Sequence, residues 1–295
     1  MLCACIDIGS NTTRVLVADV EDGRLREVLQ QRAFTRIGTG LRGGEIPHEK
    51  IAEVAAVVTE QRALVEQLGR AALRVVATAA IRGAANSGEF IAALRGDCGV
   101  DVEVLDGAEE ARLAFLGATR TLGEPLPGRV GVVDVGGGST ELALGTLDAG
   151  ATWSESFRVG SGMLADGYCR SDPPSAAELH AMREHAHGVF EGLALPPVDA
   201  AVAVGGSAAS LRRLVGATLD AESLERAMRV LSSEPAEAVA RRLSLNRERV
   251  SLMPAGLTVL DAASHALGRP LRIGRGGLRE GVLLELGGAL ASNAE

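Results

Sequence analysis

The chain has 295 residues, of which 46% are hydrophobic, 23% are charged and only 2% are aromatic. This length and balance predict a globular protein of two domains, with cores filled mainly by Ala, Leu and Val. The net charge of −8 argues against nucleic-acid or anionic-membrane partners, and Lys50, the single lysine, excludes P-loop and Schiff-base chemistry. The four cysteines form no disulfide framework and the sequence shows no leader or membrane-length apolar run, so we expect a cytoplasmic location.

Strands and helices are expected to alternate through the first half, residues 1–124, which predicts an α/β layered domain. The expected elements, in chain order, are a hairpin with strands at 3–8 and 14–20, a helix at 49–68, a strand at 73–78, a helix at 86–94, a strand at 100–105 and a helix at 106–118.

The Pro- and Gly-rich residues 123–128 predict a linker, so a second α/β domain is expected over residues 125–295. Its expected elements are strands at 130–133 and 154–159, a helix ending near 193, a strand at 200–204, a helix from 208, and mostly helical chain from 221 onward. Two such domains would leave a cleft between them, where ligands tend to bind.

Two hairpin turns, residues 7–13 and 134–141, share one pattern: an aspartate in an apolar strand is followed by glycine and hydroxyl residues. Backbone N–H groups of such a turn can approach an anion closely, and the hydroxyls add donors. Either turn alone could be an ordinary tight hairpin, but two copies in matching contexts favour a duplicated phosphate grip. A glycine-rich turn at a helix start adds a weaker anion site. The phosphate-binding candidates are Gly9, Ser10, Asn11, Thr12, Gly136, Gly137, Gly138, Ser139, Gly205, Gly206 and Ser207.

Three carboxylates in these turns are candidate metal ligands. Asp134 and Glu141 flank the second glycine loop and could point toward one hard cation, and Asp7 holds the equivalent place in the first loop. Mg²⁺ or Mn²⁺ suits this set, because Mg²⁺ prefers one or two protein carboxylates together with phosphate oxygens and waters. The alternative is that these acids are exposed at the edges of the hairpins.

Glu110 and Arg82 are the candidate catalytic residues. Asp106 and Glu109 fit a helix capping box, which leaves Glu110 free to act as a general base on a water; an exposed carboxylate at a helix N-terminus is the alternative. Arg82 follows a buried strand and could place its guanidinium on phosphate oxygens, or could be an ordinary surface arginine.

With these residues assembled, the chain resembles the exopolyphosphatase/guanosine pentaphosphate phosphatase (Ppx/GppA) family, in a short two-domain form. The matching segments are residues 7–12, 78–86, 107–113, 134–141, 205–207 and 277–281. The resemblance implies two actin-like (ribonuclease H-like) domains and Mg²⁺-dependent hydrolysis of a terminal phosphoanhydride. It also implies that Glu110 is the base, that Asp134 and Glu141 belong to the cation site, and that Arg82 and Ser139 bind phosphate.

The implied substrate is inorganic polyphosphate or a guanosine polyphosphate, whose terminal anhydrides are alike. A regulator that binds such a nucleotide without hydrolysing it, and an ATP-dependent kinase or ATPase, are the competing functions. The Glu-Glu-Ala-Arg segment at residues 109–112 favours hydrolysis over both. The resemblance further leads us to expect a homodimer.

Overall fold

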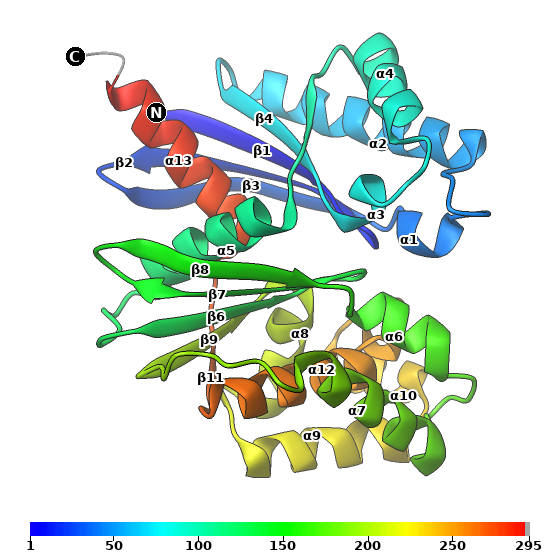
Figure 1. Ribbon diagram of the computed structural model, residues 1–295. Helices are drawn as coiled ribbons and strands as arrows, with labels where there is room; N and C mark the ends of the chain where they lie inside the picture. The colour runs from blue at the N-terminus through cyan, green and yellow to red at the C-terminus, as the bar shows by residue number, and fades with distance from the viewer. Residues whose placement is uncertain (293–295) are drawn as a thin grey trace.

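The computed structural model describes residues 1–292 and places two mixed β-sheets one above the other, with helices between and outside them (Figure 1). The first sheet has the strand order β3-β2-β1-β4-β5. Its strands are β1 (Leu2–Ile8), β2 (Thr13–Glu21), β3 (Arg24–Ala33), β4 (Ala72–Ala77) and β5 (Val102–Val104).

The second sheet repeats this order with one added edge strand, β10-β11-β9-β6-β7-β8. Its strands are β6 (Val130–Val135), β7 (Thr140–Thr146), β8 (Gly150–Phe157), β9 (Ala200–Val204), β10 (Thr218–Leu219) and β11 (Leu271–Ile273). In both sheets the first strand pairs antiparallel with the second and parallel with the fourth. The two domains are therefore duplicates in topology, as the paired turns predict.

The helices follow the predicted apolar patterns closely. The predicted helix at 49–68 is α2, and its apolar face packs with α4 on the first sheet. In the second domain α7, α8 and α12 enclose the largest core. The helices are α1 (Ile37–Gly40), α2 (His48–Gln67), α3 (Ala79–Arg82), α4 (Ser87–Cys98), α5 (Gly107–Thr121), α6 (Ser161–Tyr168), α7 (Ala176–Phe190), α8 (Gly205–Val215), α9 (Ala221–Ser233), α10 (Ala236–Leu243), α11 (Arg247–Ser251), α12 (Met253–Leu267) and α13 (Leu278–Ser292). No helix among residues 1–292 is long and apolar enough to cross a membrane.

Helices α5 and α13 lie between the sheets, and each covers the sheet of the other domain (Figure 1). Helix α5, which follows β5 of the first sheet, packs Ala111 and Phe115 on β6, β7 and β9. Helix α13, which follows β11 of the second sheet, packs Val282 and Leu283 on β1, β2 and β4. The expected boundary at 124/125 places α13 in the second domain, although its apolar side chains pack on the first sheet; the boundary itself stays a prediction.

The two exchanged helices cross in direct backbone contact. A Cβ added to Gly117 would lie 1.9 Å from the carbonyl oxygen of Gly277, and one added to Gly281 would lie 1.9 Å from that of Leu113. Glycine at both positions lets the helices approach this closely. The crossing fixes the N-terminal turns of α5 and α13 beside the space between the domains.

Candidate active site

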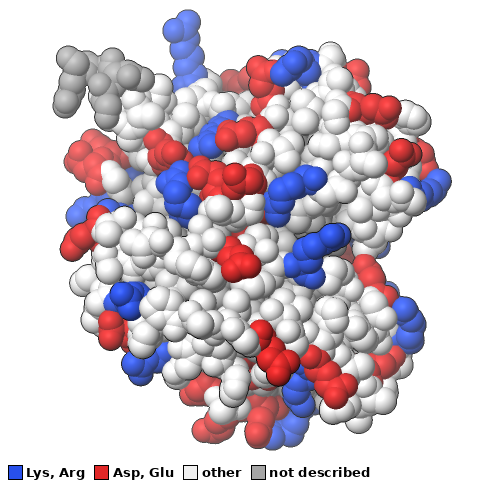
Figure 2. Space-filling view, viewed as in Figure 1, with Lys and Arg blue, Asp and Glu red and all other residues white. Residues whose placement is uncertain are grey.

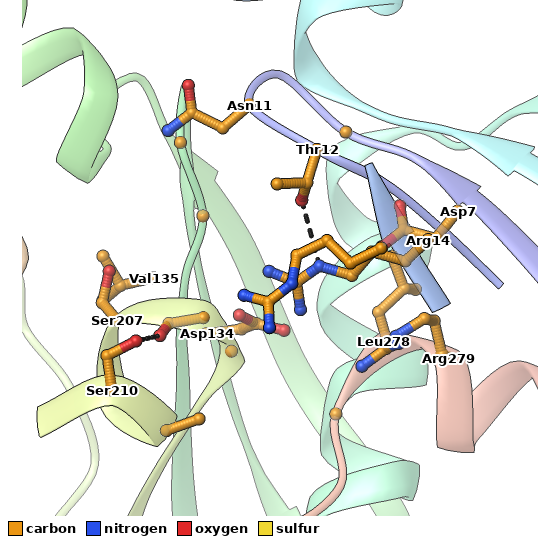
Figure 3. A pocket seen from close by; sticks show the side chains of 18 of the residues that line it. Asp7, Asn11, Thr12, Arg14, Asp134, Val135, Ser207, Ser210, Leu278 and Arg279 are labelled. Carbon is orange, nitrogen blue, oxygen red and sulfur yellow. Dashed lines mark hydrogen bonds between the residues drawn. The ribbon is translucent and has the colours of Figure 1, made fainter. Parts of the chain in front are cut away.

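A cleft of about 530 Å³ lies between the domains. The two hairpin turns and the N-terminal ends of α8 and α13 form its walls, and Figure 3 shows Asp7, Arg14, Asp134 and Arg279 gathered in it. All eleven residues expected to bind phosphate line it, together with the three expected metal ligands and Glu110. Arg82 is absent from the lining that residues 1–292 supply.

The two hairpin turns have the same backbone geometry. Gly9 N–H donates to the carbonyl of Thr12, and Gly136 N–H donates to the carbonyl of Ser139, both at 3.0 Å. The tips touch each other, because a Cβ on Gly138 would meet the Ser10 hydroxyl at 2.6 Å. Glycine at the second tip therefore allows both turns to face one ligand.

The third glycine turn is the first turn of α8, so this helix begins three residues earlier than expected. Gly205 has a φ of +84°, and a Cβ there would meet Oδ1 of Asp134 at 2.0 Å. Both facts require glycine at this position. The N-terminus of α8 then lies directly beside the Asp134 carboxylate, where its free N–H groups can bind an anion.

The acids of the cleft raise the pKa values of one another. Asp134 and Glu141 are direct cross-strand neighbours on β6 and β7. Burial, and then the charge of Asp7, raises the pKa of Asp134 to about 6, while burial and Asp134 raise the pKa of Glu141 to about 7. These values show that the carboxylates lack full charge compensation.

These carboxylates fit the expected divalent cation in number and type. Among residues 1–292 no three acidic, His or Cys side chains form a ready metal cluster. Asp134 and Glu141 nevertheless share one face of the sheet, line the cleft and have raised pKa values that a cation would lower. Two carboxylates completed by water and phosphate oxygens are what Mg²⁺ favours over an all-protein cage.

Glu110 is a buried carboxylate at the start of α5. Its side chain reaches the cleft, and Arg82 donates from Nη1 to its Oε2 at 2.9 Å. Burial, and then the charge of Glu141, raises the pKa of Glu110 well above its usual value despite this contact. Asp106 accepts from the N–H of Glu109 at 2.8 Å, which is one half of the predicted capping box; the Glu109 carboxylate instead accepts from Arg112. Because Glu110 is only 7% exposed, the alternative of an exposed acid is wrong.

Arg82 contacts Glu110 and is not among the described residues that line the cleft. Its Nη1 donates to Glu110 and also to the carbonyl of Leu105 at 2.8 Å. The expected contact of Arg82 with phosphate stays a prediction, and the contact that its guanidinium makes in the structure holds the Glu110 carboxylate. The sequence could not show this, since the direction of the side chain depends on the distant start of α5.

Six arginines that the sequence analysis did not name as site residues line the cleft: Arg14, Arg32, Arg213, Arg249, Arg275 and Arg279. A Cβ on Gly206 would meet Arg249 Nη1 at 2.6 Å and Arg14 Nη2 at 2.8 Å, so two guanidinium groups meet at the N-terminus of α8. Burial, and then the charges of Arg279 and Arg249, lowers the pKa of Arg14 to about 9. Uncompensated positive charge at this point favours a bound polyanion.

Arg14 could have been predicted as a site residue from its position in the first hairpin. Arg14 pairs with Asp7 across β1 and β2 in the same register in which Glu141 pairs with Asp134. Acidic and basic side chains are interspersed on the face shown in Figure 2. Inside the cleft, arginines and carboxylates are likewise both present.

Most of the chain matches a known family. The model of the Ppx/GppA phosphatase family matches residues 16–288. The chain belongs to the Ppx/GppA phosphatase family. It is similar to exopolyphosphatase 1 of Mycobacterium tuberculosis, with 29% identity over 306 residues that cover 96% of this chain and 88% of the relative.

Two further similarities agree with this assignment. Exopolyphosphatase 2 of M. tuberculosis is 35% identical over 190 residues, which cover 61% of this chain and 59% of the relative. The crystal structure of the Aquifex aeolicus member of the Ppx/GppA family superposes with a TM-score of 0.82, at 28% identity and 99% coverage of both chains. The expected family, the two-domain α/β fold and the assignment to an enzyme family are confirmed.

Proposed function

We propose that this chain is an exopolyphosphatase that releases the terminal phosphate of inorganic polyphosphate by Mg²⁺-dependent hydrolysis. The observation that carries the proposal is Glu110, a buried carboxylate with a raised pKa beside two phosphate-gripping turns. Membership of a phosphatase family and relatives named exopolyphosphatase support it.

The terminal phosphoryl group would lie between the two hairpin turns. Their backbone N–H groups and the N-terminus of α8 would donate to its oxygens, and Arg14 and Arg249 would bind phosphates further along the chain. Such fixed donors stabilise the charge of a phosphoryl transition state without reorganising. Bound Mg²⁺ at Asp134 and Glu141 would add positive charge at the same place.

Glu110 would act on the attacking water. The oxygen of the water attacks the terminal phosphorus, its proton passes to Glu110, and the bridging P–O bond breaks to release the shortened polyphosphate. A raised pKa makes Glu110 a stronger base near neutral pH, and Arg82 keeps the carboxylate in place. General-base assistance contributes about 10²- to 10⁴-fold to such reactions.

A phosphate-release assay with Mg²⁺ tests the proposal. It compares tripolyphosphate, long-chain polyphosphate, guanosine pentaphosphate and ATP at matched concentrations. We expect the highest kcat/KM with one of the two polyphosphates. Release from ATP alone would overturn the proposal, and tight binding of any of these anions without phosphate release would indicate a sensor.

Guanosine pentaphosphate is the second candidate substrate, and one contact at the cleft favours it. The guanidinium of Arg32 lies over the ring of Phe34, 5.8 Å from its centroid, and both residues line the cleft. An arginine and an aromatic ring together can stack on a nucleobase, which bare polyphosphate lacks. If the nucleotide is the substrate, Phe34→Ala should lower kcat/KM for guanosine pentaphosphate and leave that for tripolyphosphate unchanged.

A further inference from the structure

The hydroxyl of Ser156 lies between the two acids that the proposed reaction needs. Ser156 on β8 is the direct cross-strand neighbour of Glu141 on β7, which in turn neighbours Asp134 on β6. The three side chains therefore share the face of the sheet that α5 covers. This row ends where Glu110 enters the cleft.

Ser156 is hydrogen-bonded directly to Glu141 and, through Arg82, is connected to Glu110. Its Oγ donates to Oε1 of Glu141 at 2.8 Å and accepts from Nη2 of Arg82 at 3.5 Å. The same guanidinium donates from Nη1 to Oε2 of Glu110 at 2.9 Å. A serine hydroxyl can donate and accept at once, so one atom joins a carboxylate of the second domain to an arginine of the first.

The start of α5 is packed against the same serine. A Cβ added to Gly107 would lie 2.4 Å from the Cβ of Ser156, so α5 reaches this position only because its first residue is glycine. The helix that carries Glu110 and the hydroxyl that holds Glu141 are thus fixed against each other. A larger side chain on either partner would separate them.

We propose that Ser156 is a positioning residue that fixes the Glu141 carboxylate toward the cation site and ties it to the Arg82–Glu110 pair. The proposal rests on the proposed function, because it assumes a divalent cation at Asp134 and Glu141. Residues that hydrogen-bond to metal-binding carboxylates orient them, and their loss costs about 10- to 100-fold in metal affinity or activity.

The test is a Mn²⁺ titration followed by electron paramagnetic resonance, made on the whole chain together with tripolyphosphate kinetics. We expect Ser156→Ala to weaken Mn²⁺ binding about tenfold or more and to lower kcat by a similar factor, with little change in KM. Ser154→Ala is the matched control, since Ser154 lies two residues away on the same face of β8 and pairs with Ala143. It should behave like the wild type.

Unchanged Mn²⁺ affinity and kcat in Ser156→Ala would overturn the assignment, as would an equal loss in Ser154→Ala. The titration needs no turnover, so it tests the role of Ser156 independently of catalysis. A wild type that binds Mn²⁺ but releases no phosphate would overturn only the proposed function. A wild-type protein that binds no Mn²⁺ would overturn both the cation site and the role of Ser156. Thermal unfolding of both variants separates loss of binding from loss of fold.

Discussion

The two hairpins of the cleft share one backbone and differ in charge at a single matching position. Arg14 stands opposite Asp7 in the first hairpin, and Glu141 stands opposite Asp134 in the second. The first hairpin thus pairs its aspartate with a cation, and the second pairs its aspartate with another acid. In the proposed mechanism, the first hairpin of this duplicated scaffold binds phosphate and the second binds the cation.

The exchanged helices α5 and α13 also differ at a matching position. The fourth residue of α5 is Glu110, which faces the cleft, and the fourth residue of α13 is Gly281, which packs on the backbone of α5. At this fourth position only α5 carries a carboxylate, the proposed general base, whereas the acid that α13 adds to the cleft, Glu280, is its third residue. The comparison teaches that the duplicated fold supplies the cleft and that a few unmatched side chains supply the proposed chemistry.

We expect the largest effect from removing Glu110, the proposed base, which has no counterpart at the fourth position of α13. Glu110→Gln keeps the shape of the side chain but cannot accept a proton, so phosphate release from tripolyphosphate should fall about 10²- to 10⁴-fold. Initial rates at saturating substrate measure this, and calorimetric binding of tripolyphosphate serves as the control, which we expect to be unchanged. A variant that retains most of the wild-type rate would remove Glu110 from the mechanism.

A smaller effect, on KM, is expected from a change at Arg14 in the first hairpin. Arg14→Gln removes a buried cation that points at the N-terminus of α8, so KM for tripolyphosphate should rise about 10- to 100-fold, as expected for losing a charge-assisted hydrogen bond. Steady-state kinetics give KM and kcat separately. The account is contradicted if kcat falls and KM stays constant.

The smallest effect concerns stability without divalent cations. The pKa of Asp134 is raised from 3.8 to about 6 in the folded protein, so ionising this carboxyl destabilises the fold. This loss of unfolding free energy is absent below pH 3.8 and complete above pH 6. Asp134→Asn should therefore raise the free energy of unfolding by about 1–3 kcal/mol at pH 8, and the gain should shrink as the pH falls toward 4. Urea unfolding in EDTA at both pH values measures it, and a destabilised variant at pH 8 would refute the argument.

Much of the fold could be predicted from local sequence patterns. The apolar periodicity of residues 49–68 and the paired aspartate and glycine turns gave α2, the hairpins and the duplication, because these signals lie within one element. The exchange of α13 could not be predicted. Its place depends on contacts with strands that lie more than 200 residues earlier in the sequence.

The same distinction between local and long-range signals applies to the candidate site. Its acids and glycines lie in short sequence motifs, so they could be predicted from the sequence, and the structure brings them together. Arg249 was missed because it and Arg14 meet only at the start of α8, and the contact of Arg82 with Glu110 was missed because Glu110 lies on another helix. Side-chain direction across elements is the part that sequence alone does not provide.

The contrast between the hairpins is tested most directly by Mn²⁺ titration of one variant from each. The account predicts that Glu141→Gln weakens Mn²⁺ binding at least tenfold, whereas Arg14→Gln, which removes a nearby positive charge, leaves it unchanged or slightly tighter. Equal loss in both variants, or unchanged binding in Glu141→Gln, would contradict the assignment of the cation to the second hairpin.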